Sequence, residues 1–547
     1  MPIRCHRSRN CYRTRNTVVI SVAFGDLGAF GNGERNLYGG AAINPYSRQL
    51  RRHLWATLIH TDLNMVGATG EWDTEVTAVI SRTTDYVLSA DFSALTPVIV
   101  PKAVTAPAEA APSQANNVGP GNAWFTFTQP RWTRKLTHHL TKNLTLYASD
   151  MIVTEIPSEF QDFMFELGVG AGMRKAYSYM MGERDALMDP YKYYDWPSGQ
   201  ALIGQKAAQP APAPGSSFSG VTLQSERVRN PLHALYFSRA LGSAFCQGAI
   251  PFNECSLRFR LPHLHEVLAF DTCGVQMPYT RDGATYPWYV FLVPGGENVD
   301  NCPIHSFLDG GIVPKLLHVT VGTTQVVLTN FDRKFITSAL QHENLIEQVQ
   351  VHPSATWKMG ENPSATLDLR FGQQLKYLLA GVKNCSAPGE AAIYSLFTPK
   401  AGNLLDQEHK RGPIIVLEDP NRDANPIGHI TLRYENQPRM SDNTVLFAGI
   451  EPFHGAEYCP IGERFGFNLL RYSHRMLSTQ PDLSTNGSKL ASMQVELEQS
   501  DEAAELFQLD DEEGCQRRRL PKFRTVFMGV NMTILLMSMG AAGFVFS

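Results

Sequence analysis

The chain has 547 residues, of which 48 are basic and 52 acidic, giving a net charge of −4, and 43% of its residues are hydrophobic. This length predicts two to four domains with a large core, and the balanced charge argues against a general nucleic-acid binder, because such proteins usually carry a basic excess. Nine scattered cysteines without close pairs favour reduced, buried thiols over a disulfide framework or a zinc site.

The first sixteen residues hold five arginines and no acidic residue. Such a segment is typical of a basic arm that stays solvated, or that contacts an anionic surface, a neighbouring subunit or a membrane headgroup layer. It lacks the apolar stretch of a secretory signal, so we predict no signal peptide.

From Thr17 onward the chain is strand-like. The runs VVISVAF, EVTAVI, YVLSADF and PVIV are β-branched or alternate between apolar and polar residues, and Gly, Asn and Pro clusters separate them. The glycine-rich stretch 25–40 lacks the Lys-Ser/Thr ending of a phosphate-binding loop, and we interpret it as turns. Two Ala/Pro/Ser-rich stretches, 101–122 and 205–220, cannot pack a core and are predicted to be loops inserted in a β scaffold.

Two helices are predicted. One begins near Ser158, which can cap it, and its apolar face contains Phe160, Phe163 and Leu167. The other covers FDRKFITSAL, where Asn330 can cap. Each helix follows an apolar strand run, so a strand–helix unit occurs once in each half of the chain. This recurrence indicates a mainly β protein with two similarly folded halves.

The uncharged segment from Val526 to Ser547 allows two interpretations. By length it could cross a bilayer, for which roughly 20 apolar residues suffice. Its glycines at 529, 540 and 543 suit turns and bulges, and its β-branched residues suit strands. We predict that the segment forms the last strands of a β domain, and we keep a membrane anchor as the alternative.

No motif in the sequence predicts catalysis. The histidine-containing stretches 137–139, 263–266 and 352–354 are interpreted as ordinary surface histidines. His263 and His265 would share one face of a strand, but a third ligand is missing at a diagnostic spacing. We therefore predict no catalytic residue, no cofactor, no metal site and no enzyme activity.

Two further features concern the surface. The charged block 495–520 is interpreted as a solvated loop, with a contact loop for a neighbouring subunit as the alternative. Asn-x-Ser/Thr sequons, which are candidate glycosylation sites, occur at Asn143, Asn384, Asn486 and Asn531.

The segment LTNFDRKFITSALQHENLIEQVQ, residues 328–350, resembles a signature of the major capsid proteins of nucleocytoplasmic large DNA viruses. In that family an Asp-x-x-Glu-Arg-Arg-Arg-Phe helix leads into a His-Glu-x-Leu-Ile-Glu-Gln strand. The matching helix residues here are Asp332, Arg333, Lys334 and Phe335, and the matching strand residues are His342, Glu343, Leu345, Ile346, Glu347 and Gln348.

Four more stretches agree with this family, in its order. Residues 155–168 resemble its first-barrel helix, 230–255 the segment that closes its first barrel, and 531–544 its closing stretch. The sequence departs from the family at Pro481-Asp482-Leu483 and at Asn253, differences that concern loops rather than the overall fold. In QPDLSTNGSKL the matching residues are Gln480, Pro481, Asn486, Ser488 and Lys489.

The resemblance implies an all-β fold of two tandem eight-stranded antiparallel jelly-roll barrels, with short helices in the loops. It divides the chain into a basic arm at 1–16, a first jelly roll at 17–262 and a second at 263–547. The implied function is that of a structural major capsid protein of a large icosahedral DNA virus. In that role three copies form a pseudo-hexagonal capsomer, and the capsomers tile the shell.

The resemblance also implies partners and a location. The partners are other copies of the chain, neighbouring capsomers, minor capsid and penton proteins, and an inner membrane contacted indirectly through the arm, with no specific nucleic acid. The location is the virion capsid, with assembly in the host cytoplasm. Three alternatives stay open: a minor capsid paralogue of the same fold, a jelly-roll enzyme that acts on glycans, and a tail-anchored membrane protein.

Overall fold

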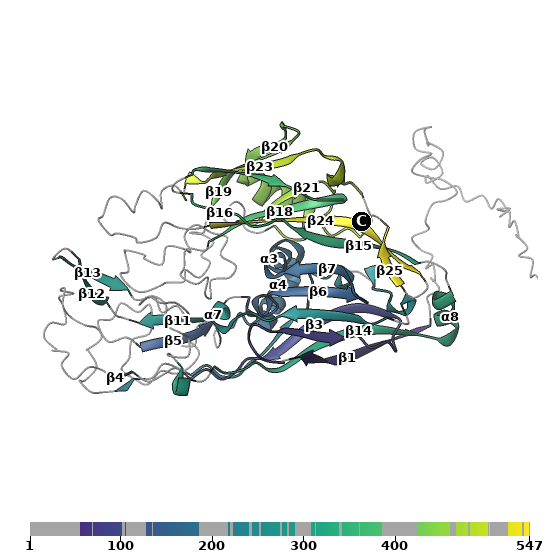
Figure 1. Ribbon diagram of the computed structural model, residues 1–547, viewed down its shortest axis with the longest axis horizontal. Coiled ribbons are helices and arrows are strands. Elements are labelled where there is room, and N and C mark those ends of the chain that lie inside the picture. The colour runs from purple at the N-terminus through teal and green to yellow at the C-terminus, as the bar shows by residue number, and fades with distance from the viewer. Residues whose placement is uncertain are drawn as a thin grey trace, which may run out of the picture. The chain divides into compact units, whose positions relative to one another are not determined.

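The computed structural model describes residues 55–545 with gaps, the longest of which are 106–126, 188–216, 290–307, 385–424 and 504–522. The basic arm and most of both Ala/Pro-rich stretches lie outside the described residues. The described strands form two sandwiches, in which all pairs of neighbouring strands are antiparallel (Figure 1).

Eight strands make up the first sandwich, and we number them one to eight in chain order. The front layer has the order β1-β14-β3-β9 and the back layer the order β2-β10-β6-β7. Strands one, eight, three and six thus face strands two, seven, four and five, which is a jelly roll. The strands are β1 (Ala56–Gly67), β2 (Glu75–Val79), β3 (Tyr86–Leu95), β6 (Asn143–Ala148), β7 (Met151–Pro157), β9 (Arg227–Asn230), β10 (Cys255–Arg260) and β14 (Leu317–Leu328).

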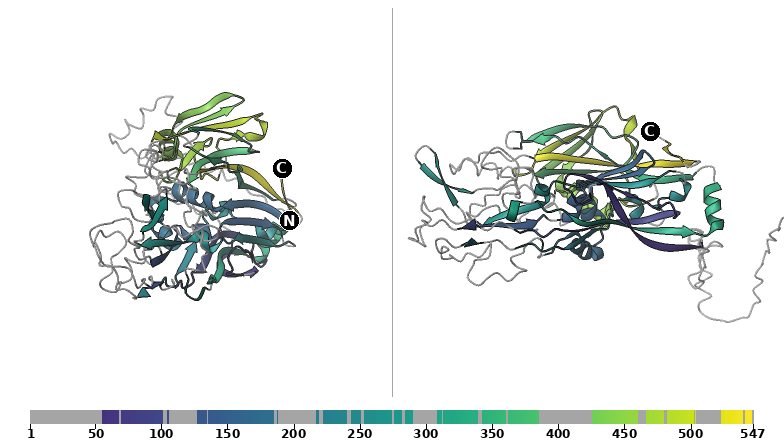
Figure 2. Two further views of the ribbon diagram at one scale, coloured as in Figure 1. Left: turned by 60° about the vertical axis from the view of Figure 1, so that its left-hand side comes forward. Right: turned by 60° about the horizontal axis from the view of Figure 1, so that its bottom comes forward.

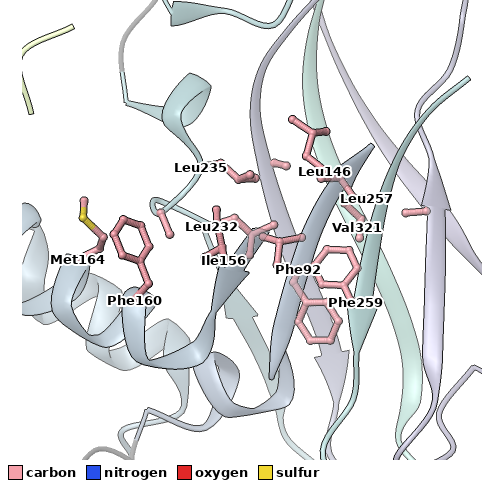
Figure 3. Packing of buried hydrophobic residues seen from close by; sticks show 14 of the residues in the cluster. Phe92, Leu146, Ile156, Phe160, Met164, Leu232, Leu235, Leu257, Phe259 and Val321 are labelled. Atoms are coloured by element: carbon pink, nitrogen blue, oxygen red, sulfur yellow. The ribbon is translucent and has the colours of Figure 1, made fainter. Parts of the chain in front are cut away.

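The core of the first sandwich lies between its two layers. Phe92 of β3 and Phe259 of β10 are fully buried, and their ring centroids are 5.4 Å apart. Leu146 and Leu257 of the back layer and Val321 of the front layer join them (Figure 3). Because successive side chains on a strand point to opposite faces, the alternation seen in the sequence supplies this core from both layers.

The second sandwich repeats the same strand order. Its front layer is β15-β24-β18-β21 and its back layer is β17-β23-β19-β20, again strands one, eight, three, six and two, seven, four, five. The predicted double jelly roll is confirmed. The strands are β15 (His342–Val351), β17 (Ser364–Leu369), β18 (Gln374–Asn384), β19 (Ile427–Tyr434), β20 (Gln437–Asn443), β21 (Asn468–Arg471), β23 (Met493–Gln499) and β24 (Phe523–Ser538), with β16 (Thr356–Trp357), β22 (Thr485–Asn486) and β25 (Ala541–Phe544) extending the front layer.

Strand β24, in the front layer of the second sandwich, is buried on both faces. On β24, Phe527 packs into the core shared with the back layer, whereas Met528 and Val530 join the core of the first sandwich. A strand covered on both sides has no need of polar residues, which explains the uncharged C-terminal segment. The predicted strands are therefore confirmed, and among the described residues no helix is both long and apolar enough to span a bilayer.

Short helices occupy the connections. Ser158 is the first residue of α3 and bonds Glu159, so the predicted cap role of Ser158 is wrong. At α8, Thr329 exchanges hydrogen bonds with Asp332 and takes the cap role that was predicted for Asn330. The helices are α2 (Leu136–Leu140), α3 (Ser158–Phe163), η2 (Met164–Gly168), α4 (Ala171–Met181), α7 (Leu264–Val267), α8 (Asn330–Ser338), η10 (Val445–Ile450) and α9 (Glu451–Gly455), together with the single turns η3 (Tyr236–Ser238), η5 (Gln247–Ala249), η7 (Asp309–Gly311) and η12 (Gly487–Lys489).

The change from one sandwich to the other falls later than the predicted boundary at 262/263. Strand β14 pairs with β1 and β3, so the first sandwich extends to Leu328. Helix α8 then leads to β15, the first strand of the second sandwich. The eighth strand closes the front layer of a jelly roll, and a long connection separates it from the seventh. This connection carries the hairpin of β12 (Gln276–Arg281) and β13 (Ala284–Tyr289), and also β11 (Leu268–Cys273), which pairs with β5 (Phe127–Trp132) from the connection between β3 and β6. The short strands β4 (Val104–Thr105) and β8 (Ser217–Phe218) pair with each other.

Candidate functional site: the buried polar contacts between the two sandwiches

The family-signature segment lies where the two sandwiches meet. Helix α8 and strand β15 connect the sandwiches, and β15 pairs along its length with β24. Within one compact unit that begins at Trp55, charged side chains from both sandwiches are buried together at this interface. Burying a charge is unfavourable unless it is paired and hydrogen-bonded, so the partners of these groups decide what the site does.

Arg333 of α8 fastens the helix to the first sandwich. Its guanidinium donates two hydrogen bonds to the buried carboxylate of Asp85, from Nε to Oδ1 at 2.8 Å and from Nη2 to Oδ2 at 3.0 Å. The same carboxylate also accepts a bond from the backbone N–H of Leu328, at the end of β14. This two-pronged pairing fixes the direction in which the chain leaves the first sandwich.

Glu347 of β15 joins the two sandwiches. Its carboxylate accepts hydrogen bonds from Lys376 on β18, at 2.6 Å, and from Arg239, which belongs to the segment after β9. Burial would raise the pKa of Glu347, but the charges of Arg239 and Lys376 hold it below its usual value. The carboxylate is therefore ionised and held between two cations, one from each sandwich.

A second ion cluster lies under α3. Glu159 accepts a hydrogen bond from Arg524 on β24 at 2.6 Å and lies 3.4 Å from the ammonium group of Lys383 on β18. Burial raises the pKa of Glu159, but these two cations outweigh that effect and lower it. Ion pairs thus connect helix α3 of the first sandwich with two strands of the second.

The predicted surface location of the histidines at 137–139 is wrong. His138 and His139 lie on α2 and are buried, with His138 Nδ1 donating to Asp162 at 2.8 Å and its Nε2 lying 3.1 Å from the Tyr177 hydroxyl. Burial lowers the pKa of His139 to about 3. The pKa of Asp162 is also lowered, because Lys135 and the histidines outweigh its burial.

Aromatic and backbone contacts complete the interface. The rings of Phe163 on α3 and Phe467 pack edge to face, with their centroids 4.9 Å apart. The side-chain amide of Gln348 on β15 donates a hydrogen bond to the carbonyl of Val153 on β7, at 2.8 Å. The carbonyl of Leu167 accepts bonds from two backbone N–H groups of the second sandwich, at residues 457 and 458. Hydrogen bonds require a particular geometry and the aromatic rings pack closely, so together these contacts fix one relative orientation of the two sandwiches.

The other signature residues have local partners. His342 Nε2 lies 2.6 Å from the carbonyl of Ile336, and Ser488 accepts a bond from the Gln373 N–H at 2.7 Å while its own N–H bonds Asn486. Asp332 is bound by Thr329, as described above, and Ile346 is buried. Leu345 is exposed and lines a shallow pocket with Glu347, and Glu343 is exposed. Phe335 lies in α8, but its side chain is not among those described. Gln480 and Pro481 lie outside the described residues.

The sequons differ in burial. Asn531 is fully buried in β24 and donates to the carbonyl of Gly372, so it cannot accept a glycan in the folded protein. Asn143 is partly exposed and bonds Glu155, Asn486 caps the turn η12, and the side chain of Asn384 lies outside the described residues.

The candidate metal-binding pair was also placed incorrectly by the sequence. His263 precedes helix α7 and forms a capping box with Glu266, rather than sharing a strand face with His265. Within the described ranges, groups of three or more potential metal ligands are absent. What the interface can do chemically is hold two domains in a fixed arrangement.

The comparisons with known proteins agree with this picture. Residues 333–543 match the family model described as the large eukaryotic DNA virus major capsid protein. The chain is 24% identical to the major capsid protein of Lymphocystis disease virus 1 (isolate Darai) and 26% identical to that of Costelytra zealandica iridescent virus, covering 96% of this chain and 98% of each relative.

Solved structures show the same fold. The Faustovirus major capsid protein has a TM-score of 0.61 with 9% identity, covering 91% of this chain and 93% of that one. The quasi-atomic model of the PBCV-1 virus capsid has a TM-score of 0.56 with 14% identity, covering 92% of this chain and 99% of that one. Both relatives and both solved structures are capsid proteins.

Proposed function

We propose that this chain is a major capsid protein of a large eukaryotic DNA virus, that three copies form a pseudo-hexagonal capsomer and that these capsomers tile an icosahedral shell; its similarity to such proteins along nearly its whole length supports this. Its place is the virion capsid, and we propose the host cytoplasm as the site of assembly.

The observation that supports this proposal is the repeated strand order. Each chain carries two sandwiches whose front and back layers have the same sequence of strands. Three chains related by a threefold axis therefore present six similar sandwiches, and a ring of six similar bodies has the outline of a hexagon. Hexagons cover a surface without gaps, which is what a shell requires.

The buried ion pairs support the same role. A tile needs a fixed angle between its two halves, and Glu347 and Glu159 each hold cations that secure this angle. Buried ion pairs contribute little net stability compared with apolar packing, but they penalise any other arrangement that leaves a charge unpaired. We infer that these contacts serve the accuracy of assembly.

The test is the mass and outline of the purified protein. Multi-angle light scattering should give three times the chain mass of 60.8 kDa, and negative-stain micrographs should show particles with a hexagonal outline. A stable monomer at micromolar concentration, or particles without that outline, would contradict the proposal.

The basic arm is proposed to act outside the capsomer. Its five arginines suit contact with inner capsid components or with the anionic headgroups of an inner membrane. Deleting residues 2–16 should leave the trimer intact and weaken binding to vesicles containing anionic lipid. Loss of the trimer on deletion would show that the arm belongs to the capsomer itself.

A further inference from the structure

Each sandwich carries a helical segment at the same place in its fold. In the first sandwich α3, η2 and α4 connect the fifth strand, β7, with the sixth, β9. In the second sandwich η10 and α9 connect the fifth strand, β20, with the sixth, β21. The two segments are equivalent by strand order, so the surroundings of one indicate what the other is built to contact.

The first helical segment is covered by the second sandwich. Phe160 and Phe163 are fully buried, and they share one apolar cluster with Val526, Met528 and Leu379, which lie on the outer face of the second front layer. Figure 2 shows these helices beside that layer from two further sides. A helical segment at this place therefore packs onto the outer face of a front layer.

The second helical segment lacks such a cover within the described part of the chain. Phe447 is buried and anchors it, but Phe453 is 73% exposed and Val445 and Ile450 are also exposed. We call these three exposed residues the α9 patch. Large apolar residues grouped on one short helical segment are typical of an interaction surface.

Among the residues that the structure describes, nothing covers the outer face of the front layer of the first sandwich either. Leu58 of β1 is 65% exposed, and Thr320 of β14 and Asp91 of β3 lie on the face opposite to the core residues Val321 and Phe92. Among the described residues, Asp91 Oδ2 and Arg229 Nε on this face lie out of contact with solvent and lack a hydrogen-bond partner, at 3.9 Å from one another.

We propose that the α9 patch of one copy packs onto the outer face of β1-β14-β3-β9 of a second copy. This inference rests on the proposed capsomer and names its contact surfaces. Within the chain, the helical segment of the first sandwich packs on the front layer of the second. By equivalence, the helical segment of the second sandwich should pack on the front layer of a first sandwich, and a second copy of the chain supplies that layer. Each chain then offers one patch and one receiving layer, a head-to-tail contact that closes into a ring of three chains and six sandwiches.

The first experiment is a pair of matched substitutions in the full-length chain. Phe453→Glu places a charge in the patch. Phe331→Glu places one on α8, where the phenylalanine is 83% exposed but lies outside the proposed contact. We expect Phe453→Glu to raise the concentration for half-maximal trimer formation at least about tenfold by sedimentation, since central aromatic residues dominate interfaces. Phe331→Glu should assemble as the wild type does.

The outcomes separate the two proposals. A wild-type monomer would overturn the proposed capsomer together with this contact. A wild-type trimer that persists undiminished in Phe453→Glu would overturn the contact alone. Circular dichroism of the dissociated variant tests whether it is folded. The milder Phe453→Ala, which removes the ring without adding a charge, must also raise the concentration for half-maximal trimer formation.

A cross-link identifies the receiving surface without destabilising the fold. Phe453→p-benzoylphenylalanine keeps an aromatic ring at the position, and mixing isotope-labelled with unlabelled chains distinguishes links between copies from links within one. We expect mass spectrometry to find inter-copy links to peptides of β1, β14 or β3. Links confined to other segments, or to the same copy, would overturn the proposal.

Discussion

The two front layers share a strand order but not a composition. The eighth strand of the first sandwich, β14, reads LHVTVGTTQVVL, with threonines on its outer face, while that of the second, β24, reads FRTVFMGVNMTILLMS. The outer face of β14 is partly exposed, whereas β24 is covered on both sides. Topology fixes which strands are neighbours, and the surroundings of each layer decide which residues its outer face carries.

Removing a buried charge at the interface should reduce the free energy of unfolding far more than removing an exposed one. Glu347→Ala would leave Arg239 and Lys376 buried without their shared anion, so we expect a loss of about 3 to 5 kcal/mol in the free energy of unfolding by urea. Glu498→Ala on the exposed face of β23 is the control and should change it by less than about 0.5 kcal/mol. Equal effects of both substitutions would contradict the role of Glu347.

Matched substitutions on the two eighth strands address the comparison directly. Met528→Ala on the covered face of β24 removes a fully buried side chain, and we expect a loss of about 2 to 5 kcal/mol in stability. Thr320→Ala on the outer face of β14 should lose less than about 1 kcal/mol when measured below the concentration at which copies associate. If the two losses were similar, the outer faces would not differ as described.

The glycines of the eighth strands offer a finer comparison. A Cβ at Gly529 would lie 2.8 Å from the ring of Phe371 in the second core, so Gly529→Ala should destabilise by about 1 to 3 kcal/mol through overpacking. A Cβ at Gly322 would meet the end of the Asp91 side chain, which is partly exposed and can shift more readily than the buried ring of Phe371, so Gly322→Ala should cost less. Thermal unfolding of both variants checks the order, and the reverse order would contradict it.

Acid should weaken the first sandwich through a buried histidine. The folded-state pKa of His139 is about 3, below the usual 6.5, so the unfolded chain binds more protons between these values and stability falls as pH falls below 6.5. From pH 6.5 to pH 5 the loss should be about 2 kcal/mol, at roughly 1.4 kcal/mol for each pH unit. His139→Gln should flatten this slope, because it removes the group that takes up the proton on unfolding.

Local sequence signals predicted several elements correctly. The strand, helix and strand at 328–350 were predicted where β14, α8 and β15 occur, and the strand-like C-terminal segment is β24 and β25. Periodicity and turn residues act within a few positions, so they can be recognised from the chain alone. The resemblance of 328–350 to a capsid signature added the double jelly roll, which the two repeated strand orders confirm.

Contacts between distant residues could not be predicted in this way. The histidines at 137–139 were expected at the surface, but α3 and α4 bury them, and Glu347 gave no sign that its partners lie at 239 and 376. The extension of the first sandwich to Leu328 was missed because β14 pairs with β1 across some 260 residues. The one signal in the sequence was the pair of isolated lysines, Lys376 and Lys383, in the otherwise apolar strand β18.

The sequence by itself determined the balance of strand and turn, the position of the signature segment and the resemblance to a family of capsid proteins. Tertiary structure alone decided which charges are buried and, among the described residues, which helical segment is covered and which front layer is exposed on its outer face. The reason is physical: backbone preferences depend on near neighbours, whereas burial and ion pairing depend on which surfaces the fold brings together.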